Sequence, residues 1–320
     1  METIALDFTR LLTPAADGEV LVEPAPASMR ALLDATAALI DRWDVSLADR
    51  DLRSVRREVR RRVADVEDER PVVVIGHQPE FIHPGVWAKH VVAARLAEAA
   101  DGVAVNLIVD TDAPQKTFLH VPMLGGERLG AGAVRFANIP AGVPYECIPR
   151  YDAAAVDRLK RALADALGPR YDRSMLGVYF EAFAGHAEPG DFVDQAVAGH
   201  RAIERRYGVT LIERRVSRVW FCPLLVEMLA RAERFFDCYN AALSDYRRAF
   251  GIRGTHRPVP DLLRRESRFE LPVWVQQADD PRSRLFVERR RGALHLFADR
   301  RSIGVIDSEA LKSWDSARTA

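Results

Sequence analysis

Hydrophobic and polar positions recur with two different periods along the chain, and the changes of period divide it into segments. Residues 27–69 carry apolar side chains near helical spacing and predict an N-terminal helical segment. Two continuous apolar runs follow, at residues 71–75 and 103–110, and such runs are typical of strands that are buried on both faces. Between them a helix is predicted over residues 86–100, opened by Pro84. Together these elements predict a βαβ unit with two parallel strands.

The pattern changes again after this unit. The segment that follows is rich in Gly and Pro, with a short strand predicted at 133–136, and a long helix is predicted from about Pro223 to Phe250. From Phe269 onward, short strands separated by turn-forming residues predict an antiparallel segment. We therefore expect an α/β fold, a Rossmann-like parallel sheet core with a helical insertion and a C-terminal antiparallel β segment. The expected parts are an N-terminal helical segment (1–70), the first half of the core (71–150), the helical insertion (151–206), the second half of the core with the long helix (207–252) and the C-terminal β-rich segment (253–320).

Composition and charge narrow the function classes. The formal net charge is +0, so the overall charge favours neither nucleic acid nor an anionic membrane as a partner. The apolar runs are too short to span a bilayer, and Glu2 and Asp7 stand where a signal peptide carries positive charge. The three cysteines, Cys147, Cys222 and Cys238, follow no spacing typical of a zinc site or a disulfide framework, and Cys238 is predicted to fill the core. These features predict a soluble, cytoplasmic protein that acts on a small molecule, with a homo-oligomer left open.

The densest polar cluster, GHQPEFIHPG, lies at the carboxyl end of the first predicted parallel strand. Ligands of open parallel sheets bind outside the carboxyl ends of the strands, and the free N–H groups of the following helix favour a phosphate or carboxylate there. His77 and His83 are candidate catalytic residues that stabilise developing negative charge. The candidate binding residues of this turn are Gly76, Gln78, Pro84, Gly85 and Lys89. The alternative is a rigid turn whose histidines hydrogen-bond only to the backbone.

A second motif, VDTDAPQK, ends the neighbouring predicted strand. Asp110 and Asp112 project to the same side if the backbone stays extended, and both are candidate catalytic residues. An Asp-x-Asp at a strand end can hold Mg²⁺ or Mn²⁺ against a diphosphate, bind a ribose hydroxyl or an amine, or begin an Asx-turn. Gln115 and Lys116 are further candidates for substrate binding. Because both motifs emerge at one edge of the same sheet, we expect them to lie close together.

A third candidate is the run FELPVWV, where Glu270 and Trp274 could wall a pocket. An ordinary strand with a buried Trp is the favoured interpretation, with Trp274 kept as a candidate for substrate binding. Neither a dinucleotide fingerprint nor a P-loop sequence is present, which disfavours a nicotinamide cofactor and P-loop hydrolysis. No nucleophile elbow occurs either.

The turn Gly76-His77-Gln78-Pro79, followed by Pro84-Gly85 and Lys89, resembles a motif of the bacillithiol-biosynthesis cysteine-adding enzymes. Tyr239-Asn240, Tyr246-Arg247 and the run from Glu270 to Trp274 are also similar to that family. The resemblance implies a Rossmann-like, nucleotidyltransferase-type core with a similarly placed pocket. Two departures stand beside it: the family's acidic E-D-H-D run is Asp110-Thr111-Asp112 here, and its long C-terminal helical segment is missing. The chain end, KSWDSARTA, carries no obvious closing element, which is consistent with a longer natural chain.

These features predict a ligase or nucleotidyltransferase-like enzyme that binds an anionic small molecule at residues 76–89. The resemblance adds amino-acid or thiol ligation as a reaction, ATP, ADP or another nucleotide as a cofactor, and Mg²⁺ as a companion ion. Two alternatives stay open: a metal-dependent glycosyltransferase that uses Asp110 and Asp112, and a non-catalytic small-molecule-binding module. The enzyme hypothesis expects His77→Ala and Asp110→Ala each to abolish ligand binding without unfolding the protein.

Overall fold

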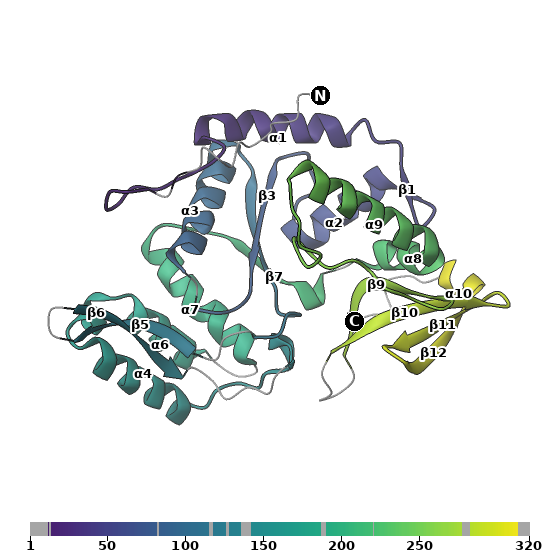
Figure 1. Ribbon diagram of the computed structural model, residues 1–320. Coiled ribbons are helices and arrows are strands. Elements are labelled where there is room, and N and C mark those ends of the chain that lie inside the picture. Colours follow the sequence, from purple (N-terminus) through teal and green to yellow (C-terminus); the bar gives the residue numbers. More distant parts are fainter. Residues whose placement is uncertain are drawn as a thin grey trace.

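Two separate sheets organise the protein, a three-stranded parallel sheet and a five-stranded antiparallel sheet, with helices on both (Figure 1). The computed structural model describes residue 12 and residues 14–81, 83–114, 118–125, 128–135, 142–186, 190–219, 221–276 and 282–312. The predicted mixed α/β class is confirmed. Within the described ranges, no helix is long and apolar enough to cross a membrane.

The parallel sheet consists of β3 (Val72–His77), β4 (Val103–Ile108) and β7 (Ile212–Arg215), in the order β3-β4-β7. β3 and β4 pair in parallel from Val72↔Val103 to His77↔Ile108, and helix α3 (Pro84–Ala99) connects them. The predicted βαβ unit is therefore confirmed. The Rossmann-like core stays a prediction, because the parallel sheet has only three strands among the described residues.

Helices cover both faces of the parallel sheet. Neighbouring residues of a strand point to opposite faces, and on β4 the side chain of Ala104 contacts Ala93 and Ala97 of α3. Val105, on the other face, packs with Ala64 of helix α2 (Leu52–Ala64). Helix α1 (Pro26–Ile40) lies across the end of this layer and contacts α3. A small hairpin of β1 (Ser46–Leu47) and β2 (Arg50–Asp51) connects α1 to α2.

A segment inserted between β4 and β7 forms a second hydrophobic core, which also includes Ile108 of β4. It begins with a hairpin, β5 (Phe118–Gly125) and β6 (Arg128–Arg135), where the sequence predicted only a short strand at 133–136. The helices are α4 (Ala153–Leu167), α5 (Arg170–Arg173), α6 (Leu176–Gly185) and α7 (Phe192–Arg206), preceded by a 3₁₀ turn at Tyr145–Cys147. Aromatic rings of α6 and α7 fill the centre, with Tyr179, Phe180, Phe183 and Phe192 fully buried.

The C-terminal part is built on the antiparallel sheet, whose strand order is β12-β11-β10-β9-β8. The predicted long helix is two helices, α8 (Cys222–Ala230) and α9 (Ala232–Ala249), because the backbone of Arg231 leaves helical geometry at φ −126° and ψ 39°. Both helices contact the face of the sheet that carries Leu271 and Leu285. The remaining elements are β8 (Arg264–Arg265), β9 (Arg268–Val275), β10 (Ser283–Arg290), β11 (Ala293–Ala298), β12 (Arg301–Asp307) and α10 (Ser308–Lys312).

Two details of this part differ from expectation. The segment 207–252 contributes only β7 to the parallel sheet, while its helices cover the antiparallel one. Cys238 is exposed on α9, so its assignment to the core was wrong. The residue lies on the outward side of the helix. The apolar run RFFDCYN does not indicate which of its residues face the core.

The close contact of α6 with α7 yields a test of the inserted core. A Cβ added at Gly199 of α7 would lie 2.5 Å from the Tyr179 ring, whereas a Cβ at Gly177 of α6 would meet nothing within 4 Å. Alanine is ordinarily about 1 kcal/mol more favourable than glycine in a helix. We expect Gly177→Ala to leave stability unchanged or slightly raised, and Gly199→Ala to lower the free energy of unfolding by about 1–3 kcal/mol through overpacking. Urea unfolding of both variants measures this, and equal stabilisation by both would contradict the packing.

Candidate functional site

The candidate site lies where the carboxyl ends of the parallel strands meet. β3 leads into the His77-Gln78 turn, β4 leads into Asp110 and Asp112, and β7 ends at Arg215. The register of the three parallel strands places these ends at one edge of the sheet. The two predicted motifs are thereby brought together, because Gln78 Nε2 donates to Asp112 Oδ2 at 3.0 Å.

The turn after β3 begins with a glycine for a steric reason. A Cβ at Gly76 would lie 3.1 Å from the carbonyl oxygen of Leu107 on the neighbouring strand. This close approach of the strands explains the glycine at position 76 without a role in ligand binding. The next residue, His77, is half-buried, and its Nδ1 lies 3.1 Å from the carbonyl oxygen of Gln78. This contact holds the ring against its own turn and leaves Nε2 without a hydrogen-bond partner among the described residues.

The start of α3 is capped, and the N–H groups of its first turn have acceptors. His83 is the N-cap residue, and its Nδ1 accepts a hydrogen bond from the Gly85 N–H at 3.1 Å. Pro84 occupies the first helical position, where no N–H group is required. Lys89 is exposed and makes no hydrogen bond or ion pair with any described residue. The Val86 and Trp87 N–H groups donate to the His83 carbonyl, so the positive features near this exposed turn are the helix dipole and Lys89.

Two residues of the insertion fix Glu80, which lies in the same turn. The hydroxyl of Tyr145 donates to the Glu80 carboxylate, and burial together with this bond raises the pKa of Tyr145. His200 Nε2 lies 2.7 Å from the Glu80 carbonyl oxygen. Burial lowers the pKa of His200 to about 4, so the ring is neutral at pH 7 and Nε2–H is the donor. The turn that carries Glu80 is therefore held against α7 by His200.

Asp110 lies beneath the edge and is fully buried. Its carboxylate accepts from Arg215 Nε at 2.7 Å, from the Ser217 hydroxyl at 2.6 Å and from the Ser217 N–H at 2.9 Å. Arg215 also donates to Asp191 at 2.7 Å, at the start of α7. Three donors satisfy a buried carboxylate, so this position of Asp110 is that of a structural ion pair between β4, β7 and α7.

Asp112 turns the other way. Its carboxylate accepts from Gln78 on one side and, at 2.8 Å, from Arg282 Nη2 on the other, and the Ala113 N–H adds a third bond at 2.9 Å. Partial burial opposes ionisation, but these hydrogen bonds together hold the pKa of Asp112 below its usual value. The chain turns after β4 instead of staying extended, so the two aspartates bind different neighbours and do not form a shared pair of ligands.

Arg282 brings the antiparallel sheet into the site. Its Nη1 donates to the Thr111 carbonyl at 3.1 Å, and its guanidinium carbon lies 4.6 Å from the centre of the Trp274 ring. Trp274 is 51% exposed, so the expectation of a buried tryptophan was wrong. Glu270 is the buried residue of this run, and it pairs with Arg284 at 2.7 Å.

The remaining candidates separate into two groups. Gln115 and Lys116 lie outside the described residues. Asn240 and Arg247, which supported the family resemblance, bind the segment after α9: Asn240 exchanges hydrogen bonds with Leu262, and Arg247 donates to Asp261 at 2.8 Å. Sequence reasoning did not find Arg215, Ser217 and Arg282. The motif-free stretches in which they lie offered no signal beyond an arginine near a predicted strand.

Comparison with known proteins adds no assignment. No protein-family model matches the chain, and no curated protein is similar to it in sequence. In the part of the chain that the structure describes, no group of three or more His, Cys, Asp and Glu side chains is placed to hold a metal ion. The functional conclusion therefore depends on the geometry of the sheet edge.

The buried histidine gives the protein a specific acid sensitivity. The folded-state pKa of His200 is about 4, below its ordinary value of 6.5, so the unfolded chain binds an extra proton between these values. Its contribution is present above pH 6.5 and is lost as the pH falls toward 4, by about 3 kcal/mol. We expect His200→Gln, which keeps a donor for Glu80, to show a shallower fall in urea-unfolding free energy between pH 7 and pH 4. Exposed His256→Gln is the control, and parallel pH profiles for the wild type and His200→Gln would contradict the buried, neutral ring.

Substitution of Asp110 and substitution of Asp112 should lower the free energy of unfolding by different amounts. Removing one partner of a buried ion pair costs about 3–5 kcal/mol, and the lower end applies here because Arg215 keeps its bond to Asp191. We expect Asp110→Asn to lower the free energy of unfolding by about 3 kcal/mol. Asp112, whose side chain is 24% exposed, should tolerate Asp112→Asn within about 1 kcal/mol. Chemical denaturation distinguishes the two, and equal losses would remove the distinction between a structural and an accessible carboxylate.

Proposed function

We propose that the protein is a ligase- or nucleotidyltransferase-like enzyme that binds an anionic small molecule, with a nucleotide as the favoured ligand, at the carboxyl edge of its parallel sheet. The phosphate or carboxylate group binds to Arg282, and Lys89 and the positive end of the α3 dipole add charge. Amino-acid or thiol ligation, as in the cysteine-adding family, is the reaction that the sequence resemblance supports.

The observation that carries this proposal is the meeting of two distant elements on one carboxylate. Gln78, from the turn before α3, and Arg282, from the antiparallel sheet, both donate to Asp112. Arginine presents a planar fork of donors that matches phosphate and carboxylate groups. The ion pair is only partly buried, with side chains 22% and 24% exposed, so the guanidinium lies within reach of a ligand.

Trp274 favours a nucleotide over a simpler anion. Half of its surface is exposed beside the Arg282 guanidinium. An exposed aromatic ring is a stacking platform for a nucleobase, and neighbouring arginines supply the charge for phosphates. A stacked nucleobase would cover this exposed ring.

The glycosyltransferase alternative loses its main support. It required Asp110 and Asp112 to present their carboxylates to one metal ion on a sugar nucleotide. Asp110 is instead buried in its pair with Arg215, and Asp112 bonds to Gln78 and Arg282. A Mg²⁺ ion that acts here would be bound mainly by the ligand's own phosphates and water, as is usual for this ion. A binding module without catalysis is compatible with the same contacts, and turnover assays separate it from an enzyme.

A thermal-shift screen of nucleotides, amino acids and sugar phosphates, with and without Mg²⁺, tests the proposal. A ligand present at 100 times its Kd stabilises the protein by about 2.7 kcal/mol. We expect ATP or ADP to raise Tm, and Arg282→Ala and Trp274→Ala each to weaken the affinity at least tenfold. Loss of the arginine removes a charge-assisted hydrogen bond, and loss of the indole removes the stacking surface.

Trp43→Ala is the matched control, because Trp43 is also about half exposed and lies in the connection between α1 and β1, which contributes no residue to the proposed site. It should retain the wild-type shift. If no nucleotide shifts Tm, or if Arg282→Ala binds as well as the wild type, the proposed site is wrong. Circular dichroism of each variant confirms that any loss is not caused by unfolding.

A further inference from the structure

A cavity of about 460 Å³ lies beside the end of β7, and Ile108 at the end of β4 also lines it. It is bordered by α2, by α7 and by the 3₁₀ turn at Val216–Arg218. β7 is an edge strand of the parallel sheet, and the cavity lining includes neither Gln78, Asp112 nor Arg282. Its volume suits a small metabolite.

Arginines dominate the lining: Arg62, Arg201, Arg214, Arg215 and Arg218, against the carboxylates of Asp194 and Glu213. Arg214 and Arg215 are held by Asp65 and Asp110. Two others have donors to spare. Arg218 is exposed and makes no hydrogen bond or ion pair with the described residues, and Arg201 bonds to Glu213 through Nε only, with its side chain 54% exposed. The Arg218 guanidinium and the unused Nη donors of Arg201, both at the cavity, favour an oxyanion between them.

Glu213 supplies the second, independent observation. Its side chain is 3% exposed, and its Oε1 is buried without a hydrogen-bond partner among the described residues. Burial raises the pKa of Glu213 to about 7, because the loss of hydration outweighs the attraction of Arg201. A buried acceptor without a partner is unfavourable, so a ligand that donates a hydrogen bond to it gains affinity.

We propose that this cavity binds a small metabolite that carries a carboxylate or phosphate group together with a hydrogen-bond donor. The oxyanion lies between Arg201 and Arg218, and the hydroxyl or ammonium donor reaches Glu213. The site is distinct from the one at the sheet edge and does not rest on the proposed function. The two adjoin through Arg215, which lines the cavity and binds Asp110 beneath the edge.

The test compares three probes at equal ionic strength against sodium chloride. Glycerol 3-phosphate carries a phosphate and hydroxyls, glycine carries a carboxylate and an ammonium group, and acetate carries the oxyanion alone. We expect glycerol 3-phosphate, glycine or both to raise Tm more than acetate does, which also identifies the oxyanion. Arg218→Ala should weaken that binding at least tenfold. Glu213→Gln should reduce the preference over acetate, and Arg218→Ala decides alone if that variant does not fold.

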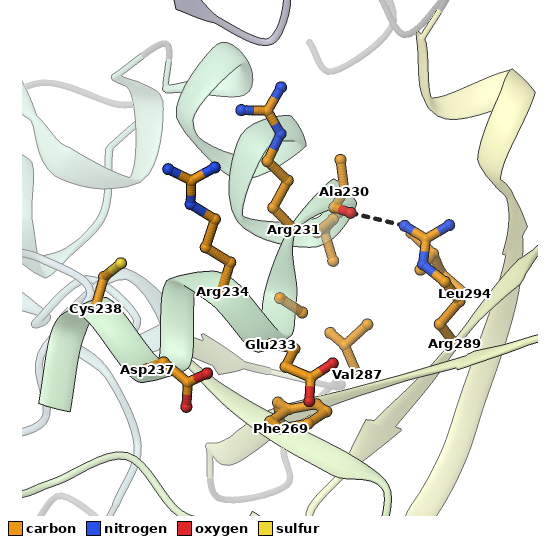
Figure 2. A pocket seen from close by; sticks show the side chains of 12 residues that line it. Ala230, Arg231, Glu233, Arg234, Asp237, Cys238, Phe269, Val287, Arg289 and Leu294 are labelled. Atoms are coloured by element: carbon orange, nitrogen blue, oxygen red, sulfur yellow. Dashed lines mark hydrogen bonds between the residues drawn. The ribbon is translucent and has the colours of Figure 1, made fainter.

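Arg234→Ala is the matched control. Arg234 extends from α9 beside a cavity of the same volume on the antiparallel sheet, which Figure 2 shows together with Arg231 and Arg289. Like Arg218, it is exposed and makes no hydrogen bond or ion pair with the described residues. Binding should be unchanged in this variant.

Three outcomes overturn the proposal: no probe shifts Tm, acetate shifts it as much as the other two, or Arg218→Ala binds as the wild type does. An equal loss in Arg234→Ala would likewise show a non-specific charge effect. Nucleotide binding measured on Arg218→Ala and probe binding measured on Arg282→Ala keep the two sites separate, so that either can fail without the other.

Discussion

The buried ion pair of Asp110 with Arg215 is the contact on which the arrangement of the site depends. It joins residues 105 positions apart, at the points where the chain leaves β4 and where it completes β7. The insertion, with its hairpin and its helices α4 to α7, leaves the sheet next to Asp110 and returns to it in β7, which ends at Arg215. Arg215 extends the network to Asp191 at the start of α7, and α7 in turn carries His200, which holds the Glu80 turn. Buried charges are tolerated only when they are paired, so the network permits little variation in how these elements meet.

The sequence was informative where the signal is local. β3 and β4 are continuous apolar runs, and α3 has a proline at its start, so their pairing and order could be predicted. β7 has no such local signal, because its sequence, IERR, is mostly charged and its side-chain partners lie at the end of α2 and on α7. The hairpin of β5 and β6 was also largely missed, since its glycines obscure the alternation of a strand. The break at Arg231 has no Gly or Pro signal, and only the packing of α8 and α9 on the antiparallel sheet accounts for two helices there.

For the site, sequence reasoning found the residues but not their directions. Gln78 and Asp112 were expected to be neighbours, and they are hydrogen-bonded. That Asp110 points away from Asp112 depends on Arg215, whose position relative to β4 no local pattern encodes. Trp274 was expected to be buried because tryptophan usually is. Leu271, Val273 and Val275 face the helices, so Trp274 falls on the opposite face of β9, which α8 and α9 leave uncovered.

The proposed site thus needs both sheets, and the energetics of its central contact suit a place where a ligand binds. The pair of Arg282 with Asp112 is partly exposed, and such pairs contribute at most about 1 kcal/mol to stability. An incoming phosphate can therefore share or replace Asp112 as the partner of the guanidinium without a large loss of folding free energy. The pair of Asp110 with Arg215 cannot be exchanged in this way, since Asp110 is fully buried and a competitor for its place would first have to be desolvated. The two aspartates thus have different roles: Asp110 holds the sheet edge in place, and Asp112 keeps Arg282 available to the ligand.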